Sequence, residues 1–311
     1  MNLADGIVLL CKTPGPTSFS SLNSVKKALN TKKVGHTGTL DSFASGLLVV
    51  CTGRLTKLAG KITGFNKTYE AVIKFGEETD TCEYTGNVIR KTSLPNENDL
   101  RSALEKWSGN IMQKPPLFSA IHIDGKRASD LARSGKEVEI PERPVTVFHS
   151  EIKELKFSKD DSSLVEYAHI VFSVSKGTYI RSLARDIAKS AGSAAHLVGL
   201  FRTKVGNFCV EDSAGFGFMP QFGIDSAIEI MESQKAECNT NGLKNAKNRE
   251  NVIQNDDLLK KEIVSKKQNM TRETAKMCGF EVICLKNHTS LEDFKNGKPL
   301  RQELFETCKR T

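Results

Sequence analysis

The stretch that decides the fold runs from residue 35 to residue 50 and reads Gly-His-Thr-Gly-Thr-Leu-Asp-Ser-Phe-Ala-Ser-Gly-Leu-Leu-Val-Val. Its glycines permit backbone conformations that other residues avoid, and they let a ligand approach the main chain. The apolar residues at its end are typical of a buried strand. We therefore expect a loop that carries Asp41 into a cleft. The alternative is a tight turn in which Asp41 bonds only its own backbone.

Six further motifs surround this stretch. They are Lys-Thr-Pro-Gly-Pro-Thr-Ser at 12–18, Lys-Thr-Tyr at 67–69, Gly-Glu-Glu-Thr-Asp-Thr at 76–81, Gln-Lys-Pro-Pro-Leu-Phe-Ser-Ala at 113–120, Lys-Gly-Thr-Tyr-Ile-Arg-Ser-Leu at 176–183 and Leu-Phe-Arg-Thr at 200–203. With residues 35–46 they make seven motifs that resemble, in content and order, those of the TruB family of tRNA pseudouridine synthases. The resemblance favours the cleft over the simple turn and implies the pseudouridine synthase fold.

The reaction implied by this resemblance breaks the bond between C1′ and N1 of uridine and rejoins the base through C5. It involves no redox change, so we expect no cofactor. Asp41 is the expected catalytic carboxylate, which attacks the sugar or the base or stabilises charge at C1′, as glycosidase carboxylates do. Tyr69 is expected to stack on the flipped uracil, a contact worth roughly 1–3 kcal/mol per base, and to assist removal of the C5 proton. Taken alone, Tyr69 would be a core residue of a strand.

Arg181 is the expected partner of Asp41. It falls in the first turn of a predicted helix, where the helix dipole disfavours a cation by a few tenths of a kcal/mol, so an acidic partner is expected nearby. An exposed arginine without a specific role is the alternative from position alone. In the TruB family the equivalent arginine pairs with the catalytic aspartate, and the resemblance extends that role to Arg181.

Four more residues are predicted to bind the substrate. The resemblance implies that His36 fills space in the RNA loop or contacts the surroundings of the flipped nucleotide, and that Leu200 closes the uracil pocket. Lys12 is expected to support the site or a phosphate, and Arg202 to contact a phosphate. Individually, each could be an ordinary core or surface residue. Ser42 stands where the family has proline, so we expect a slightly looser loop after Asp41.

The hydrophobic periodicity indicates an α+β fold. Residues 69–75 alternate between apolar and polar side chains, as a half-buried strand does, and a second long strand is predicted over 164–174. Residues 100–107 and 180–191 have helical spacing, and Gly109 and Gly192 are placed to end these helices. Because no regular alternation of strand and helix appears, we expect a mixed, largely antiparallel sheet flanked by helices.

The chain is predicted to have three parts. Residues 1–225 form the catalytic domain. Residues 226–279 form a polar linker, mobile or loosely helical, because they contain few residues able to build a core. Residues 280–311 form a short, degenerate extension, read as a remnant of the PUA-like RNA-binding domain that bacterial relatives usually carry here.

The composition restricts the partners and the location. A formal net charge of +8 and a pI of about 9.0 favour a polyanionic partner. The eight cysteines have no zinc-ligand spacing, and we expect reduced thiols and no metal. No segment resembles a signal peptide or a membrane span, which predicts a cytoplasmic protein without membrane contact. We expect a monomer with no obligatory protein partner.

The leading hypothesis is an enzyme that converts the uridine at position 55 in the T-loop of tRNAs to pseudouridine, with tRNA as its partner. One alternative is a tRNA-folding chaperone whose catalysis is dispensable. Another is the catalytic subunit of a guide-RNA ribonucleoprotein, which is disfavoured because such relatives depend on a complete PUA domain.

Overall fold

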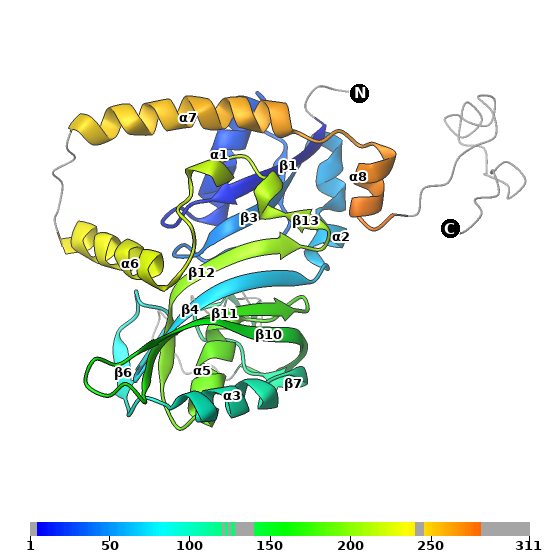
Figure 1. The fold of residues 1–311 in the computed structure, drawn as a ribbon. Coiled ribbons are helices and arrows are strands. Elements are labelled where there is room, and N and C mark those ends of the chain that lie inside the picture. The colour runs from blue at the N-terminus through cyan, green and yellow to red at the C-terminus, as the bar shows by residue number, and fades with distance from the viewer. Residues whose placement is uncertain (1–4, 120–121, 124–125, 128–139, 240–245, 281–311) are drawn as a thin grey trace, which may run out of the picture. The chain divides into compact units, whose positions relative to one another are not determined.

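The computed structural model describes residues 5–119, 122–123, 126–127, 140–239 and 246–280. Nine of the described strands form one sheet, drawn in Figure 1, in the order β1-β3-β12-β4-β11-β10-β7, with β2 paired to β3 and β13 to β12. The strands are β1 (Gly6–Lys12), β2 (Val34–His36), β3 (Ser45–Thr52), β4 (Lys67–Phe75), β7 (Gly109–Gln113), β10 (Arg143–Phe157), β11 (Val165–Val174), β12 (Ala195–Val205) and β13 (Phe208–Cys209). The neighbouring strands are antiparallel except β3 and β12, which are parallel.

Two small antiparallel ladders and several helices complete the described elements. The ladders are β5 (Glu77–Thr79) with β6 (Val88–Lys91), and β8 (His122–Ile123) with β9 (Lys126–Arg127). The α-helices are α1 (Ser18–Ala28), α2 (Ala59–Thr63), α3 (Glu97–Lys106), α5 (Ile180–Ser190), α6 (Ile224–Asn239), α7 (Ala246–Lys266) and α8 (Arg272–Met277). Short 3-10 turns are η1 (Gly53–Leu58), η2 (Val210–Asp212) and η3 (Phe216–Phe218).

The sheet carries two apolar cores. In the larger one, α5 packs on β12 and β4, α3 packs on α5, and α6 packs on β12 and β11. In the smaller one, α1 packs against β1, β2 and α7. Every residue of β3 is buried, which explains its continuous apolar run. This strand therefore anchors the loop that precedes it.

The sequence predictions for the sheet are confirmed. The alternating segment is β4, the second long strand is β11, and the two helical segments are α3 and α5. Gly192 follows α5 with a φ of 72°, the left-handed conformation that commonly ends a helix. Arg181 lies in the first turn of α5, as expected.

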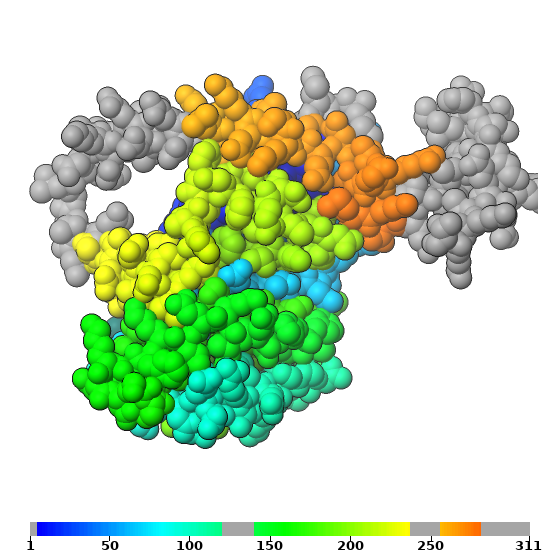
Figure 2. All heavy atoms as spheres, viewed as in Figure 1, coloured from blue at the N-terminus to red at the C-terminus, as the bar shows by residue number. Residues whose placement is uncertain are grey.

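The segment after residue 225 differs from the linker that the sequence predicts. Two of its helices pack on the sheet unit: α6 buries Ile224, Ala227 and Met231, and α7 buries Ile263. In the space-filling view the side chains of α6 lie directly on those of the sheet (Figure 2), and Lys156 of β10 pairs with Asp225 at 2.8 Å. A few apolar residues at helical spacing are enough to stabilise a helix when they pack on a core that already exists.

The described residues fall into two compact units, divided between Lys267 and Gln268, so α6 and α7 belong with the sheet. The second unit contains α8. The PUA-like remnant predicted for 280–311 lies almost entirely outside the described residues, and it stays a prediction.

Among the described residues, five cysteines are free, no group of three or more metal-ligating side chains occurs, and no helix is long and apolar enough to cross a membrane.

Candidate active site

The loop between β2 and β3 carries Asp41, and two elements from the N-terminus hold it. The hydroxyl of Ser18, the first residue of α1, accepts from the amide of Leu40 at 2.7 Å and donates to the Leu40 carbonyl at 2.9 Å. Lys12 at the end of β1 donates to the carbonyls of Ser42 at 3.1 Å and Ala44 at 2.6 Å. The Ser42 carbonyl also accepts from a backbone amide at 2.8 Å, so the loop is fixed without the proline of the family motif.

Arg202 of β12 holds the same loop from the other side. Its guanidinium donates to the carbonyls of Leu47 at 2.8 Å, Gly38 at 3.1 Å and Thr39 at 3.5 Å, and the residue is 2% exposed. These carbonyls use three of the five guanidinium donors, and the predicted phosphate contact of Arg202 stays a prediction. This arrangement favours a role in positioning the loop.

Gly46 allows β3 to approach β12 closely. A Cβ atom on Gly46 would lie 2.4 Å from the carbonyl oxygen of Arg202, and its φ of 101° is in the region that favours glycine. No other residue type fits this position without moving the strand.

A third support reaches the loop from α6. Phe43 packs edge-on against Tyr84, with ring centroids 5.8 Å apart at 89°. The hydroxyl of Tyr84 in turn donates to the side-chain oxygen of Gln234. Helix α6 therefore supports the loop that carries Asp41.

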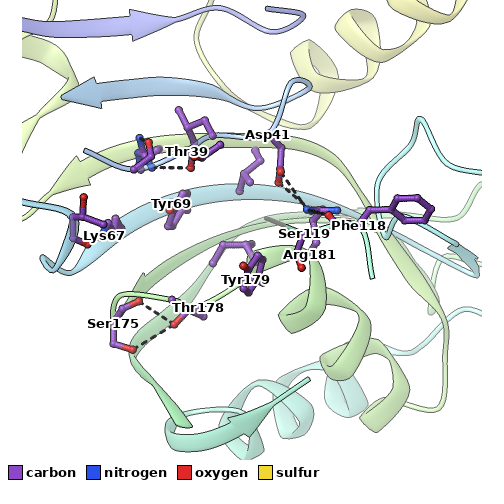
Figure 3. Close-up of a pocket in the computed structure, with 17 residues that line it drawn as sticks. Thr39, Asp41, Lys67, Tyr69, Phe118, Ser119, Ser175, Thr178, Tyr179 and Arg181 are labelled. Carbon is purple, nitrogen blue, oxygen red and sulfur yellow. Dashed lines mark hydrogen bonds and ion pairs between the residues drawn. The ribbon is translucent and has the colours of Figure 1, made fainter. Parts of the chain in front are cut away.

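Asp41 forms the expected ion pair with Arg181, in a two-point arrangement (Figure 3). Arg181 Nε lies 3.0 Å from Oδ2 of Asp41, and Nη2 lies 3.2 Å from Oδ1. The arginine also donates to the carbonyls of Thr81 and Phe118, each at 2.9 Å. Its side chain is 6% exposed, against 36% for Asp41, so a buried arginine orients a carboxylate that solvent or a ligand can reach.

A second carboxylate lies behind this pair. Glu83 Oε2 is 4.0 Å from Arg181 Nε, and Glu83 Oε1 accepts from the hydroxyl of Thr85 at 2.7 Å. Burial raises the pKa of Glu83, and the charge of Arg181 only partly opposes this. Sequence reasoning missed this residue, although it lies two positions after the motif at 76–81.

A cavity of about 510 Å³ opens over Asp41, and this volume suits a nucleoside-sized ligand. Tyr69 and Leu200 line it beside Asp41 and Arg181, and Tyr69 is 9% exposed. The Tyr69 hydroxyl has no hydrogen-bond partner among the described residues. The expected cleft is therefore present, with an aromatic ring, an aliphatic side chain and a carboxylate at its wall.

Two buried lysines stand close to the cavity. Burial lowers the pKa of Lys12 to about 8, with Asp41 opposing the shift and Arg202 adding to it. Burial, Arg202 and Lys176 lower the pKa of Lys67 to about 8. Lys67 lines the cavity, and the motif at 67–69 contains it, but sequence reasoning assigned it no role.

His36 lies at the end of β2, where its Nδ1 accepts from the amide of Gly38 at 3.4 Å. Burial and the charge of Arg202 lower its pKa, which favours the neutral ring. His36 and Lys12 are absent from the cavity wall, so both act on the loop rather than line the cavity. Their predicted contacts with substrate remain predictions.

The family model for "TruB family pseudouridylate synthase (N terminal domain)" matches residues 26–180. The tRNA pseudouridine synthase B of Treponema denticola is 42% identical over 311 residues, which cover 96% of this chain and 85% of the relative. The chain belongs to the TruB family. The tRNA pseudouridine synthase B of Borreliella burgdorferi is also 42% identical, over 247 residues that cover 79% of this chain and 86% of the relative.

A solved structure extends the TruB comparison to the fold. A chain of a Cbf5-Nop10-Gar1 complex is 28% identical, with a TM-score of 0.51, and the match covers 67% of this chain and 51% of that chain. This chain thus spans about half the length of that one. The pseudouridine synthase fold predicted from the sequence is confirmed.

Proposed function

We propose that this chain converts uridine to pseudouridine at position 55 in the T-loop of tRNAs, without a cofactor. The observation that carries the proposal is the two-point pair of Arg181 with Asp41 at the wall of a nucleoside-sized cavity. The names of the relatives, tRNA pseudouridine synthase B, support tRNA as the substrate.

The target uridine first leaves its stack in the RNA loop, at a cost of a few kcal/mol. Its base enters the cavity and lies on Tyr69, with Leu200 closing the pocket beside it. Stacking on one aromatic ring returns roughly 1–3 kcal/mol, so it offsets much of the cost of flipping.

Asp41 then acts on the nucleotide as a nucleophile, at the sugar or at the base. Arg181 holds both carboxylate oxygens, so the attacking oxygen needs no reorientation during the reaction. The bond between C1′ and N1 breaks, the uracil turns, a bond between C1′ and C5 forms, and the bond that Asp41 made to the nucleotide breaks, which restores the carboxylate. C5 loses a proton, with the free hydroxyl of Tyr69 beside the base to assist, and N1 gains one, so the product is an isomer of the substrate.

The test is tritium release from a tRNA transcript labelled at C5 of uridine, with carbodiimide mapping to locate the product. The wild type should release tritium at the T-loop uridine, and Asp41→Asn, which keeps the shape of the side chain, should release none. Binding of the same transcript by both proteins is the control.

Tritium release by both proteins would exclude Asp41 as the nucleophile. Release by neither, with tRNA binding intact, would favour the tRNA-folding chaperone instead. The relatives do not favour the guide-RNA subunit. The monomeric state, the cytoplasmic location and the independence from protein partners remain predictions.

A further inference from the structure

A second cavity of about 520 Å³ adjoins the catalytic one, with Thr63, Gly177 and Tyr179 in the walls of both. Its described wall also contains Arg143 and Lys176, and no carboxylate. Neither cation has an ion-pair partner among the described residues. The space next to the uracil pocket therefore presents uncompensated positive charge.

Lys67 lines the catalytic cavity, and it bonds Thr63, which lies in the walls of both cavities. It faces Val174 across the ladder of β4 and β11, so it stands where the turn 175–178 leaves the sheet, at the end of the catalytic cavity away from Asp41 (Figure 3). Its ammonium donates to the carbonyls of Thr63 at 2.7 Å and Phe65 at 2.5 Å. An ammonium has three donors, and the third has no acceptor among the described residues.

The turn itself offers further donors. The amides of Lys176 and Gly177 have no acceptor among the described residues. Gly177 has a φ of 82°, and a Cβ placed on it would meet nothing within 4 Å, so the backbone here is open to a ligand. Exposed amides beside side-chain cations form the kind of concave site that binds an oxyanion.

We propose that Lys67, Lys176, Arg143 and the turn 175–178 form a binding site for one phosphodiester of the RNA backbone, next to the target nucleotide. This inference rests on the proposed function, because the uracil pocket fixes which phosphate arrives. A phosphate here would accept a hydrogen bond from the free N–H of Lys67. Its negative charge would also offset the repulsion between the charges of Lys67 and Lys176. The site thereby holds the sugar of the flipped nucleotide in register with Asp41.

The test measures binding of a T-arm stem-loop RNA and its tritium release for wild type, Lys176→Gln and Lys67→Met. Lys159→Gln is the matched control, because Lys159 is exposed and follows the far end of β10, the strand that begins at Arg143. The substrate is made in versions that carry one neutral methylphosphonate at each phosphate flanking the target uridine.

Lys176→Gln should make the dependence of log affinity on log salt shallower by about 0.7–0.9, the value for one phosphate contact. Its KM should rise and its kcat should fall, because the sugar of the flipped nucleotide is then held less firmly in register with Asp41. One methylphosphonate should weaken binding by wild type and by Lys159→Gln, and it should weaken binding by Lys176→Gln less, because one of its contacts is already missing there. Lys176→Gln keeps the test decisive if the buried change Lys67→Met prevents folding.

A salt dependence in Lys176→Gln equal to that of Lys159→Gln, or equal effects of every methylphosphonate in all proteins, would overturn the phosphate site. If wild type releases tritium in that case, the proposed function stands without it. If wild type neither binds the RNA nor releases tritium, both the function and the phosphate site fail.

Discussion

Ser18→Ala tests whether the position of Asp41 depends on the clamp at Leu40. Ser18 is 2% exposed, and its hydroxyl is the one partner of both the amide and the carbonyl of Leu40 among the described residues. Each buried group left without a partner costs about 1–3 kcal/mol, so the variant, which leaves two such groups, should lose about 2–6 kcal/mol of unfolding free energy.

The same change should slow catalysis more than it weakens binding. Leu40 precedes Asp41, and a displacement of about 1 Å at a reacting group can lower the rate about 100-fold. Ser18 itself does not line the cavity. We expect the single-turnover rate of tritium release to fall about 10- to 100-fold, with the Kd for tRNA within about twofold of wild type.

Ser24→Ala is the matched control, because Ser24 lies on the same helix and donates only to the carbonyl of Ser21 at 2.8 Å. It should change stability by less than about 0.5 kcal/mol and leave the rate unchanged. Urea unfolding and single-turnover assays at one salt concentration compare the proteins. If Ser18→Ala is destabilised but reacts as fast as Ser24→Ala, the clamp does not position Asp41.

Three further changes test other parts of the site. Arg181→Lys should lose about 3 kcal/mol or more of unfolding free energy and most tritium release, because lysine cannot bond Asp41 at two points and also two backbone carbonyls. In urea unfolding, the difference in unfolding free energy between Glu83→Gln and wild type should shift in favour of the variant as the pH rises from about 4.5 to 7. Burial raises the folded-state pKa of Glu83 above its usual 4.5, so the folded chain retains a proton that the unfolded chain releases, and this lowers wild-type stability as the pH rises through that interval. Gly46→Ala should lower the unfolding free energy by more than about 3 kcal/mol in the same assay, since its Cβ would lie 2.4 Å from a carbonyl oxygen. Gly192→Ala, at a residue with a φ of 72° and no atom within 4 Å of the added Cβ, should lower it by about 1–2 kcal/mol.

Each of these expectations has a contrary outcome. If Arg181→Lys unfolds with the same free energy as the wild type, the hydrogen bonds of the arginine contribute little to stability. A stability difference between Glu83→Gln and wild type that does not change with pH would place the titration of Glu83 near its usual range. Equal costs for the two glycine changes would show that backbone strain, and not the approach of β12, decides the effect at Gly46.

The motifs predicted Asp41, Arg181 and Tyr69 correctly as neighbours, because short-range signals and one long-range resemblance pointed to the same cleft. Glu83 could not be found in this way, since its place behind Arg181 depends on how the segment after β5 folds back. The bonds from Arg202 to the loop were also hidden, because a sequence shows a charge but not the carbonyls that surround it.

The packing of α6 and α7 on the sheet was not predicted, for a different reason. Their composition is too polar for an independent fold, and the linker prediction followed from that. Ile224, Met231 and Ile263 instead complete cores that the sheet has already formed. The burial of a helix depends on the surface that receives it, which its own sequence does not record.

The contact from Gln234 to Tyr84 has a consequence for how the protein is made. Domains generally fold from the N-terminus during synthesis, at about 5–20 residues per second, so the ribosome makes Gln234 about 10–40 s after Asp41. During that interval the nascent chain holds Phe43 and Tyr84 without the helix that supports them. The loop that carries Asp41 therefore reaches its final packing only when translation is well past the sheet, and the newborn chain gains its catalytic geometry late.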